Sequence, residues 1–118
     1  MRALETMTGV SFRFKEVPGG EIIVYTSDKE GNPQDKSALV ITPYESNLVK
    51  KAISQKDDIL MGASMDAPPE GSLGWLLKQE GLTPRHLSYL IPILLDAGFC
   101  TCSKEKKAFI IRRRGGGN

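Results

Sequence analysis

The fold is decided by residues 71–114, GSLGWLLKQEGLTPRHLSYLIPILLDAGFCTCSKEKKAFIIRRR. This stretch begins with a predicted short helix that Ser72 can cap and that Gly81 ends. A second helix starts at Thr83 and Pro84, because a capping side chain followed by proline at the first helical position is typical of a helix start. The apolar face of the first helix consists of Leu73, Leu76 and Leu77, with Trp75 predicted to anchor the contact between the helices.

The second helix is longer, and a glycine followed by two strands comes after it. Gly98 is placed to end the helix as a C′ residue. Residues 99–102 and 108–112 are then predicted as strands of a hairpin, joined by the polar residues 103–107. The apolar residues that recur on one face of this helix are Leu87, Leu90, Ile91, Leu94 and Leu95.

Pro92 interrupts the pattern of this second helix, because proline removes the hydrogen bond to the carbonyl of Ser88 and bends a helix. Three interpretations are open. The bend fits the helix to a partner, or it seats residues 93–95 in the core, or the helix stops near Ile91 and restarts at Pro92.

Two helices across a short turn, followed by a basic β-hairpin, resemble a winged helix-turn-helix over residues 71–114. The resemblance implies that the second helix enters the major groove of DNA by its N-terminal turns. The side chains that would face the groove are Thr83, Arg85, His86, Ser88 and Tyr89. The side chains that would engage the DNA backbone from the hairpin and tail are Lys104, Lys106, Lys107, Arg112, Arg113 and Arg114.

The chemistry of these residue types suits nucleic acid. Arg85 can bind guanine through two hydrogen bonds or hold a phosphate, and the hydroxyls of Ser88 and Tyr89 suit phosphate oxygens. Only Arg85 and His86 are basic in this part of the helix. Weak or shape-based binding is therefore as well supported as base recognition.

Charge is unevenly distributed along the chain. Residues 1–99 contain ten Lys and Arg against thirteen Asp and Glu, whereas residues 100–118 contain six Lys and Arg against one Glu. The net charges are −3 and +5, so a polyanion would be attracted to the C-terminal hairpin and tail. The alternative is a solvated end that only improves solubility.

The first third of the chain is predicted to be a three-stranded antiparallel meander. Residues 11–17 alternate between apolar and charged, residues 21–26 are rich in β-formers, and residues 38–41 form a short apolar run. Residues 1–9 are predicted as a loose lead-in and residues 27–36 as a loop.

A further helix starts at Thr42, Pro43 and Glu45, which occupy the positions of a capping box with an N1 proline. Residues 57–61 either prolong this helix or form a separate short turn, and residues 65–71 form a stiff connection. The apolar face consists of Leu48, Val49, Ala52 and Ile53.

These elements predict a single α+β domain over residues 1–114. An antiparallel β meander within 10–42 is followed by a three-helix winged helix-turn-helix within 43–114, with a C-terminal β-hairpin wing. Residues 115–118 are predicted to be a disordered tail.

Catalytic and metal sites are not indicated. Cys100 and Cys102 form a C-x-C pair that would need two more ligands to hold a metal, and they are predicted to be reduced thiols. His86 is the only histidine and belongs to no recognisable catalytic motif. We therefore expect no enzyme activity, no cofactor and no metal.

The predicted function is binding of double-stranded DNA, as a small transcriptional regulator or an accessory protein acting on DNA. The alternative is a protein-interaction module that uses a winged helix without nucleic acid. The N-terminal strands would then serve a homodimer or another protein partner. No apolar run approaches the roughly 18 residues of a membrane span, and residues 1–10 do not resemble a signal peptide, so a cytoplasmic location is expected.

Overall fold

Alternating apolar and polar residues near the N-terminus produce a four-stranded antiparallel sheet. The computed structural model describes residues 2–26, 39–56, 58–62, 67–105 and 108–113. The sheet has the order β1-β2-β3-β4, so that each strand pairs with the next in the chain. Its strands are β1 (Arg2–Glu5), β2 (Ser11–Glu16), β3 (Ile22–Thr26) and β4 (Leu39–Ile41). The side chains that its inner face buries are Phe12, Phe14, Ile22, Val24 and Ile41.

The prediction of a loose lead-in is wrong for Arg2–Glu5, which form the edge strand β1. This strand pairs with β2 in a register that places Leu4 opposite Phe12. Three of its four side chains are exposed, so residues 2–5 lack the alternation of apolar and polar residues from which a strand is predicted. Pairing with β2 makes this segment a strand, and the meander therefore has four strands instead of three. The predicted loop at 27–36 lies outside the described residues.

The predicted helix starts at Thr42 and Ser72 are confirmed. Helix α1 (Pro43–Gln55) is capped by Thr42, whose Oγ1 accepts a hydrogen bond from the Glu45 N–H at 3.2 Å. Helix α2 (Leu73–Gln79) is capped by Ser72, whose Oγ accepts from the Trp75 N–H at 3.1 Å. Each cap satisfies a backbone donor that has no partner within its helix.

The second helix of the predicted pair begins with a tighter turn. Residues Pro84–His86 form the 3₁₀ turn η1, which Thr83 caps, and helix α3 (Leu87–Asp96) follows directly. Pro92 lies inside α3 and is buried. The interpretation that the helix stops near Ile91 is therefore wrong. Gly98 ends the helix with a φ of 78°, as predicted for a C′ residue.

A second, three-stranded sheet has the order β5-β7-β6. Strands β6 (Cys100–Glu105) and β7 (Ala108–Arg113) are antiparallel and longer than the predicted hairpin strands. Strand β5 (Ile59–Leu60) pairs with β7, which places Ile59 opposite Ile111. Residues 59–60 are therefore neither a continuation of α1 nor a helical turn. The pairing with β7, about fifty residues further along the chain, decides their conformation.

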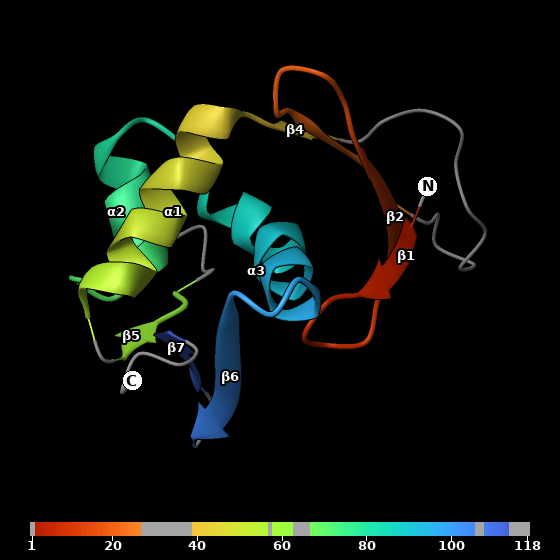
Figure 1. Ribbon diagram of the computed structural model, residues 1–118. Coiled ribbons are helices and arrows are strands. Elements are labelled where there is room, and N and C mark those ends of the chain that lie inside the picture. The colour runs from red at the N-terminus through yellow and green to blue at the C-terminus, as the bar shows by residue number, and fades with distance from the viewer. Residues whose placement is uncertain (1, 27–38, 57, 63–66, 106–107, 114–118) are drawn as a thin grey trace.

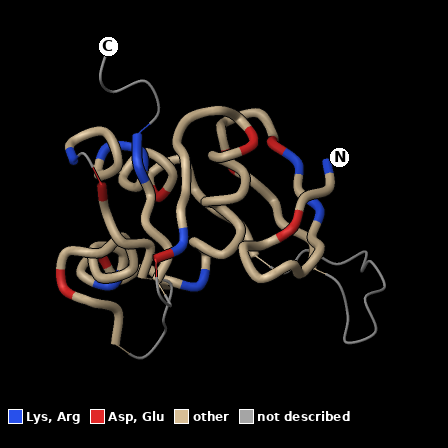
Figure 2. Tube along the Cα trace, turned by 90° about the horizontal axis from the view of Figure 1, so that it is seen from below, with Lys and Arg blue, Asp and Glu red and all other residues tan. Residues whose placement is uncertain are grey.

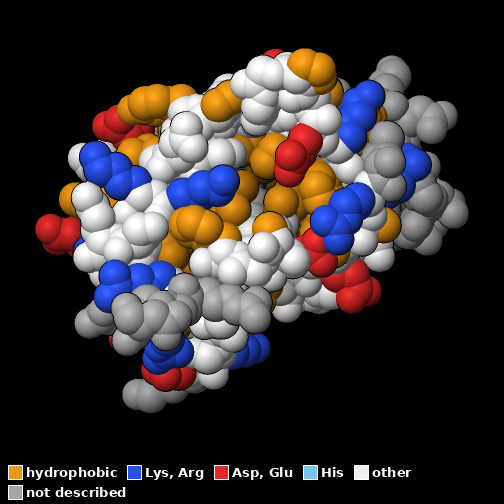
Figure 3. Space-filling view, in the orientation of Figure 1, with side chains coloured by type: hydrophobic (Ala, Val, Ile, Leu, Met, Phe, Trp, Pro, Cys, Tyr) orange, Lys and Arg blue, Asp and Glu red, His pale blue; other side chains and the backbone are white. Residues whose placement is uncertain are grey.

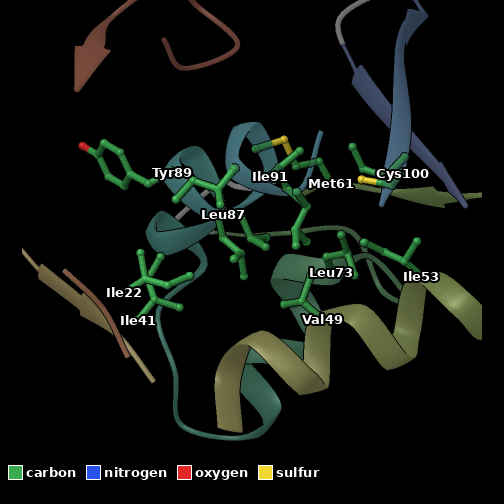
Figure 4. Close-up of a cluster of buried hydrophobic side chains, with 14 of the residues drawn as sticks. Ile22, Ile41, Val49, Ile53, Met61, Leu73, Leu87, Tyr89, Ile91 and Cys100 are labelled. Carbon is green, nitrogen blue, oxygen red and sulfur yellow. The ribbon is translucent and has the colours of Figure 1, made fainter. Parts of the chain in front are cut away.

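Helix α3 lies between the first sheet on one side and α1 and α2 on the other (Figure 1). Leu87 and Ile91 of α3 point toward Leu73 and Val49, and the side chains of Ile22 and Ile41 approach from the first sheet (Figure 4). A single hydrophobic cluster includes residues of both sheets and all three α-helices. Trp75 is only half-buried and does not belong to this cluster, so its predicted role as a core anchor is wrong.

Gly74 allows α2 to approach the segment after β5. Its N–H donates to the Met61 carbonyl at 3.0 Å, and a Cβ at this position would lie 1.7 Å from the Gly62 carbonyl oxygen. No side chain fits there, so position 74 requires glycine. The contact joins the start of α2 to the second sheet.

Candidate nucleic-acid interface

The turn before α3 presents Arg85 to solvent. Thr83 accepts the Arg85 N–H at 3.3 Å and so fixes the start of this turn. Pro84 is buried beside it, whereas the Arg85 side chain is exposed. The arrangement gives one solvent-accessible guanidinium at the start of the helix that was predicted to contact DNA.

His86 points the other way, toward α1. Its Nδ1 lies 2.9 Å and 3.1 Å from the two carboxyl oxygens of Glu45. The Glu45 side chain is 2% exposed and that of His86 is 19% exposed. His86 therefore links η1 to the first turn of α1 instead of facing outward.

Tyr89 is also turned inward. Its ring meets Phe12 of the first sheet edge-on, with ring centroids 5.2 Å apart and an interplanar angle of 82°. Ser88 is half-buried, and both residues line a cavity of about 440 Å³. Of the five side chains predicted to face a groove, Arg85 is exposed, Thr83 and Ser88 are half-buried, and His86 and Tyr89 pack within the protein.

Lys104 and Arg112 are held on the hairpin by neighbouring side chains. The Lys104 ammonium lies 5.6 Å from the centre of the Phe109 ring, a cation–π distance. Arg112 donates to Ser103 Oγ at 2.6 Å, and its other terminal nitrogen lies 3.4 Å from the Glu105 carboxylate. The predicted contacts at Lys106, Lys107 and Arg114 lie outside the described residues.

Arg113 turns toward α1, where it donates to the Ser54 carbonyl at 3.2 Å. Lys50 lies one helical turn before Ser54 and so on the same face of α1, with its ammonium 5.7 Å from the Phe99 ring centre. Lys50 was not among the predicted site residues. In the sequence, the only signal that relates Lys50 to the hairpin is its i, i+4 spacing from Ser54. This spacing can be interpreted only once the contact between α1 and β7 is known.

Positive charge is not confined to the hairpin. Lys and Arg positions lie on both sheets and on the helices (Figure 2). On the face shown in Figure 3, their side chains are interspersed with apolar and acidic side chains. This face therefore has no continuous positive surface among the residues that the structure describes.

The two cysteines are free thiols on β6. Burial, with a contribution from Cys102, raises the pKa of Cys100 to about 11. Burial also raises the pKa of Cys102, and the charge of Arg112 opposes that shift. Thiols with raised pKa values are poor nucleophiles and poor metal ligands. Within the described residues, no group of three or more His, Cys, Asp or Glu side chains could hold a metal ion.

No helix in the described part of the chain is long and apolar enough to cross a membrane. Comparisons of the chain with known protein families, with curated proteins and with solved structures found no match.

Proposed function

We propose that the chain binds double-stranded DNA as a winged-helix protein, using the start of α3 and the β6–β7 hairpin. Such a protein would act as a small transcriptional regulator or as an accessory protein on DNA. The order of the elements supports this proposal, because α2, a tight turn, α3 and an antiparallel hairpin follow one another directly. Strand β5 adds support, since its pairing with β7 fixes the hairpin to the rest of the domain.

One observation carries the proposal: the start of α3 and the start of β7 border the same cavity. Ser88 lines one side of it and Phe109 lines another. Arg85 precedes Ser88 by three residues, and Lys104 lies over the Phe109 ring. Arg85 is therefore close in sequence to one wall of the cavity and Lys104 is close in space to another, which supports contact of both cations with one duplex.

Recognition of the DNA backbone fits this arrangement better than recognition of bases. His86 and Tyr89 are engaged with Glu45 and Phe12, so Arg85 is the one exposed side chain of the five that were predicted to face the groove. Contacts from Arg85 and Lys104 to phosphates would position the protein without selecting a sequence. Their affinity would fall steeply with salt, because phosphate contacts release counterions.

The test is a fluorescence-anisotropy titration of the full chain against a random-sequence duplex at about 50 and about 200 mM salt. We expect binding at the lower salt that weakens at the higher salt. Lys104→Ala should weaken binding evenly across sequences and reduce the salt slope by about one. Arg85→Ala should behave in the same way if it contacts phosphate, or cost about 1–3 kcal/mol at particular sequences if it contacts guanine.

Lys15→Ala is the matched control, because Lys15 is an exposed lysine on β2 in the other sheet. Its loss should leave affinity unchanged. If the chain binds DNA but both test variants equal the control, the proposed surface is wrong. If the chain does not bind at the lower salt, the proposed function is wrong.

A protein-interaction module is the second candidate, and Val40 favours it. This residue is 40% exposed on β4, which ends the first sheet, and an exposed apolar edge strand can pair with another chain. Dimerisation measured by light scattering, together with an absence of DNA binding, would favour this candidate.

A further inference from the structure

A cavity lies between the β1–β2 turn of the first sheet and strands β5 and β7 of the second sheet. Its volume is about 440 Å³, within the range of roughly 300–1,000 Å³ that is usual for small-molecule sites. The turn between β1 and β2 forms one side, and the start of α3, the start of β7 and the segment from Leu60 to Gly62 with Pro69 form the others. The side chains on which the argument depends are Thr8, Val10, Met61, Ser88, Ala108 and Phe109.

Hydrogen bonds donated by backbone N–H groups hold two of these walls in place. In the β1–β2 turn, the Thr6 N–H donates to the Val10 carbonyl at 2.8 Å, and the Val10 N–H donates to Thr6 Oγ1 at 3.1 Å. On the other side, the Met61 N–H donates to the Phe109 carbonyl at 3.0 Å. A preformed site loses less conformational entropy when a ligand binds.

The lining defines the chemistry of the occupant. Carbon-rich side chains such as Met61 and Phe109 dominate, the hydroxyls of Thr8 and Ser88 add hydrogen-bonding groups, and none of the described lining residues is charged. Val10 lines the cavity and is 54% exposed, an apolar side chain that the core does not cover. Among the described lining residues, a charged ligand would lose its hydration without gaining a charged partner.

We propose that this cavity binds an uncharged, largely apolar small molecule. Ser88 belongs to α3 and Phe109 belongs to β7, so an occupant would contact both elements of the proposed DNA-binding surface. The ligand would therefore act as an effector that changes affinity for DNA. This regulatory role rests on the proposed function, whereas the binding of the ligand does not.

The first experiment measures binding to the full chain without DNA. The probe is N-phenyl-1-naphthylamine, an uncharged bicyclic aromatic whose fluorescence increases in apolar surroundings. Its sulfonated relative 8-anilino-1-naphthalenesulfonate is the charged comparison. We expect saturable binding of one equivalent of the uncharged probe, with at least about tenfold weaker binding of the sulfonate, because the described lining residues include no cation to pair with it.

Two variants place a bulky side chain at the cavity from opposite walls. Thr8→Trp and Ala108→Trp alter exposed residues, so the fold should tolerate both, and thermal unfolding would verify this. Each should weaken binding of the uncharged probe by about tenfold or more. Thr101→Trp adds the same side chain at an exposed position on β6 outside the cavity lining and should change nothing. Non-saturable binding, or equal affinity in all three variants, would overturn the proposal.

The second experiment repeats the DNA titration with the uncharged probe at saturation. A change in DNA affinity that Thr8→Trp abolishes would support the effector role. Probe binding by a chain that never binds DNA would refute the proposed function while the ligand site stands. DNA binding that is indifferent to the bound probe would refute only the regulatory role.

Discussion

Glu45 places a carboxyl group in the protein interior at the first turn of α1, and His86 is its partner. The sequence pattern predicted Glu45 as one arm of a capping box, and the Thr42 arm is present. The Glu45 carboxyl group instead accepts from His86, 41 residues away in the chain. One pair of side chains thus fixes the turn that presents Arg85 relative to α1.

Removal of this partner should destabilise the protein. His86→Ala leaves the 2% exposed Glu45 side chain without its hydrogen-bond donor, and an unsatisfied buried group of this kind costs about 1–3 kcal/mol. Urea denaturation of the purified chain measures the change in the free energy of unfolding. His86→Asn is the matched control, since its side-chain amide can donate from nearly the same place and should recover part of the loss. Equal stability of wild type, His86→Ala and His86→Asn would show that the pair contributes nothing.

Cys100 makes stability depend on pH in the alkaline range. Its pKa is about 11 in the folded protein against an ordinary value of 9.0, because burial disfavours the thiolate. Between these pH values the unfolded chain has lost the thiol proton and the folded chain still holds it. The free energy of unfolding should therefore decrease as pH rises from 9.0 to about 11. The decrease attributable to this thiol is at most about 3 kcal/mol, at about 1.4 kcal/mol per pKa unit.

Urea denaturation across this pH range measures the effect, and variants separate it from the other groups that titrate there. Cys100→Ala should lose the part of the decrease that belongs to the buried thiol. Cys102→Ala, on the same strand but less buried, should retain most of it. The same pH dependence in wild type and Cys100→Ala would show that Cys100 is not responsible.

At the scale of elements, local chemistry was sufficient to predict a helix end wherever a capping residue or a stop glycine lies there. Thr42 and Ser72 cap their helices as predicted, and Gly98 ends α3. The alternation in β2 and the β-formers in β3 also gave the correct strands. In each of these cases the deciding interactions lie within four or five residues in the chain, or on one face of one strand.

Elements that depend on distant partners could not be predicted. Strand β5 has two residues and is a strand only because β7 pairs with it, and β1 has mostly exposed side chains that give no alternating signal. The same dependence on distant partners explains why the predicted orientations of two candidate site residues were wrong. His86 and Tyr89 have the residue types of a DNA-contacting helix, but Glu45 and Phe12, both distant in sequence, turn them inward. The cavity was missed because its walls come from five separate segments.

At the scale of the molecule, α3 has no free side for its apolar residues. Its Leu87 and Ile91 side chains belong to the cluster with α1 and α2, and Tyr89 meets Phe12 of the first sheet. The first sheet is therefore not a separate unit beside a complete helical core. It supplies one wall of the core in which the proposed DNA-contacting helix is packed.

This arrangement predicts that residues 43–118 do not fold alone. Their isolation removes five buried side chains of the first sheet, each contributing about 1.5–3 kcal/mol, from a domain whose net stability is typically about 5–15 kcal/mol. It also exposes Tyr89 on α3. Thermal denaturation followed by circular dichroism should show one cooperative transition for the full chain and none for the fragment. A fragment that melts cooperatively would mean that residues 43–118 are an independent folding unit and that the first sheet is not required for their core.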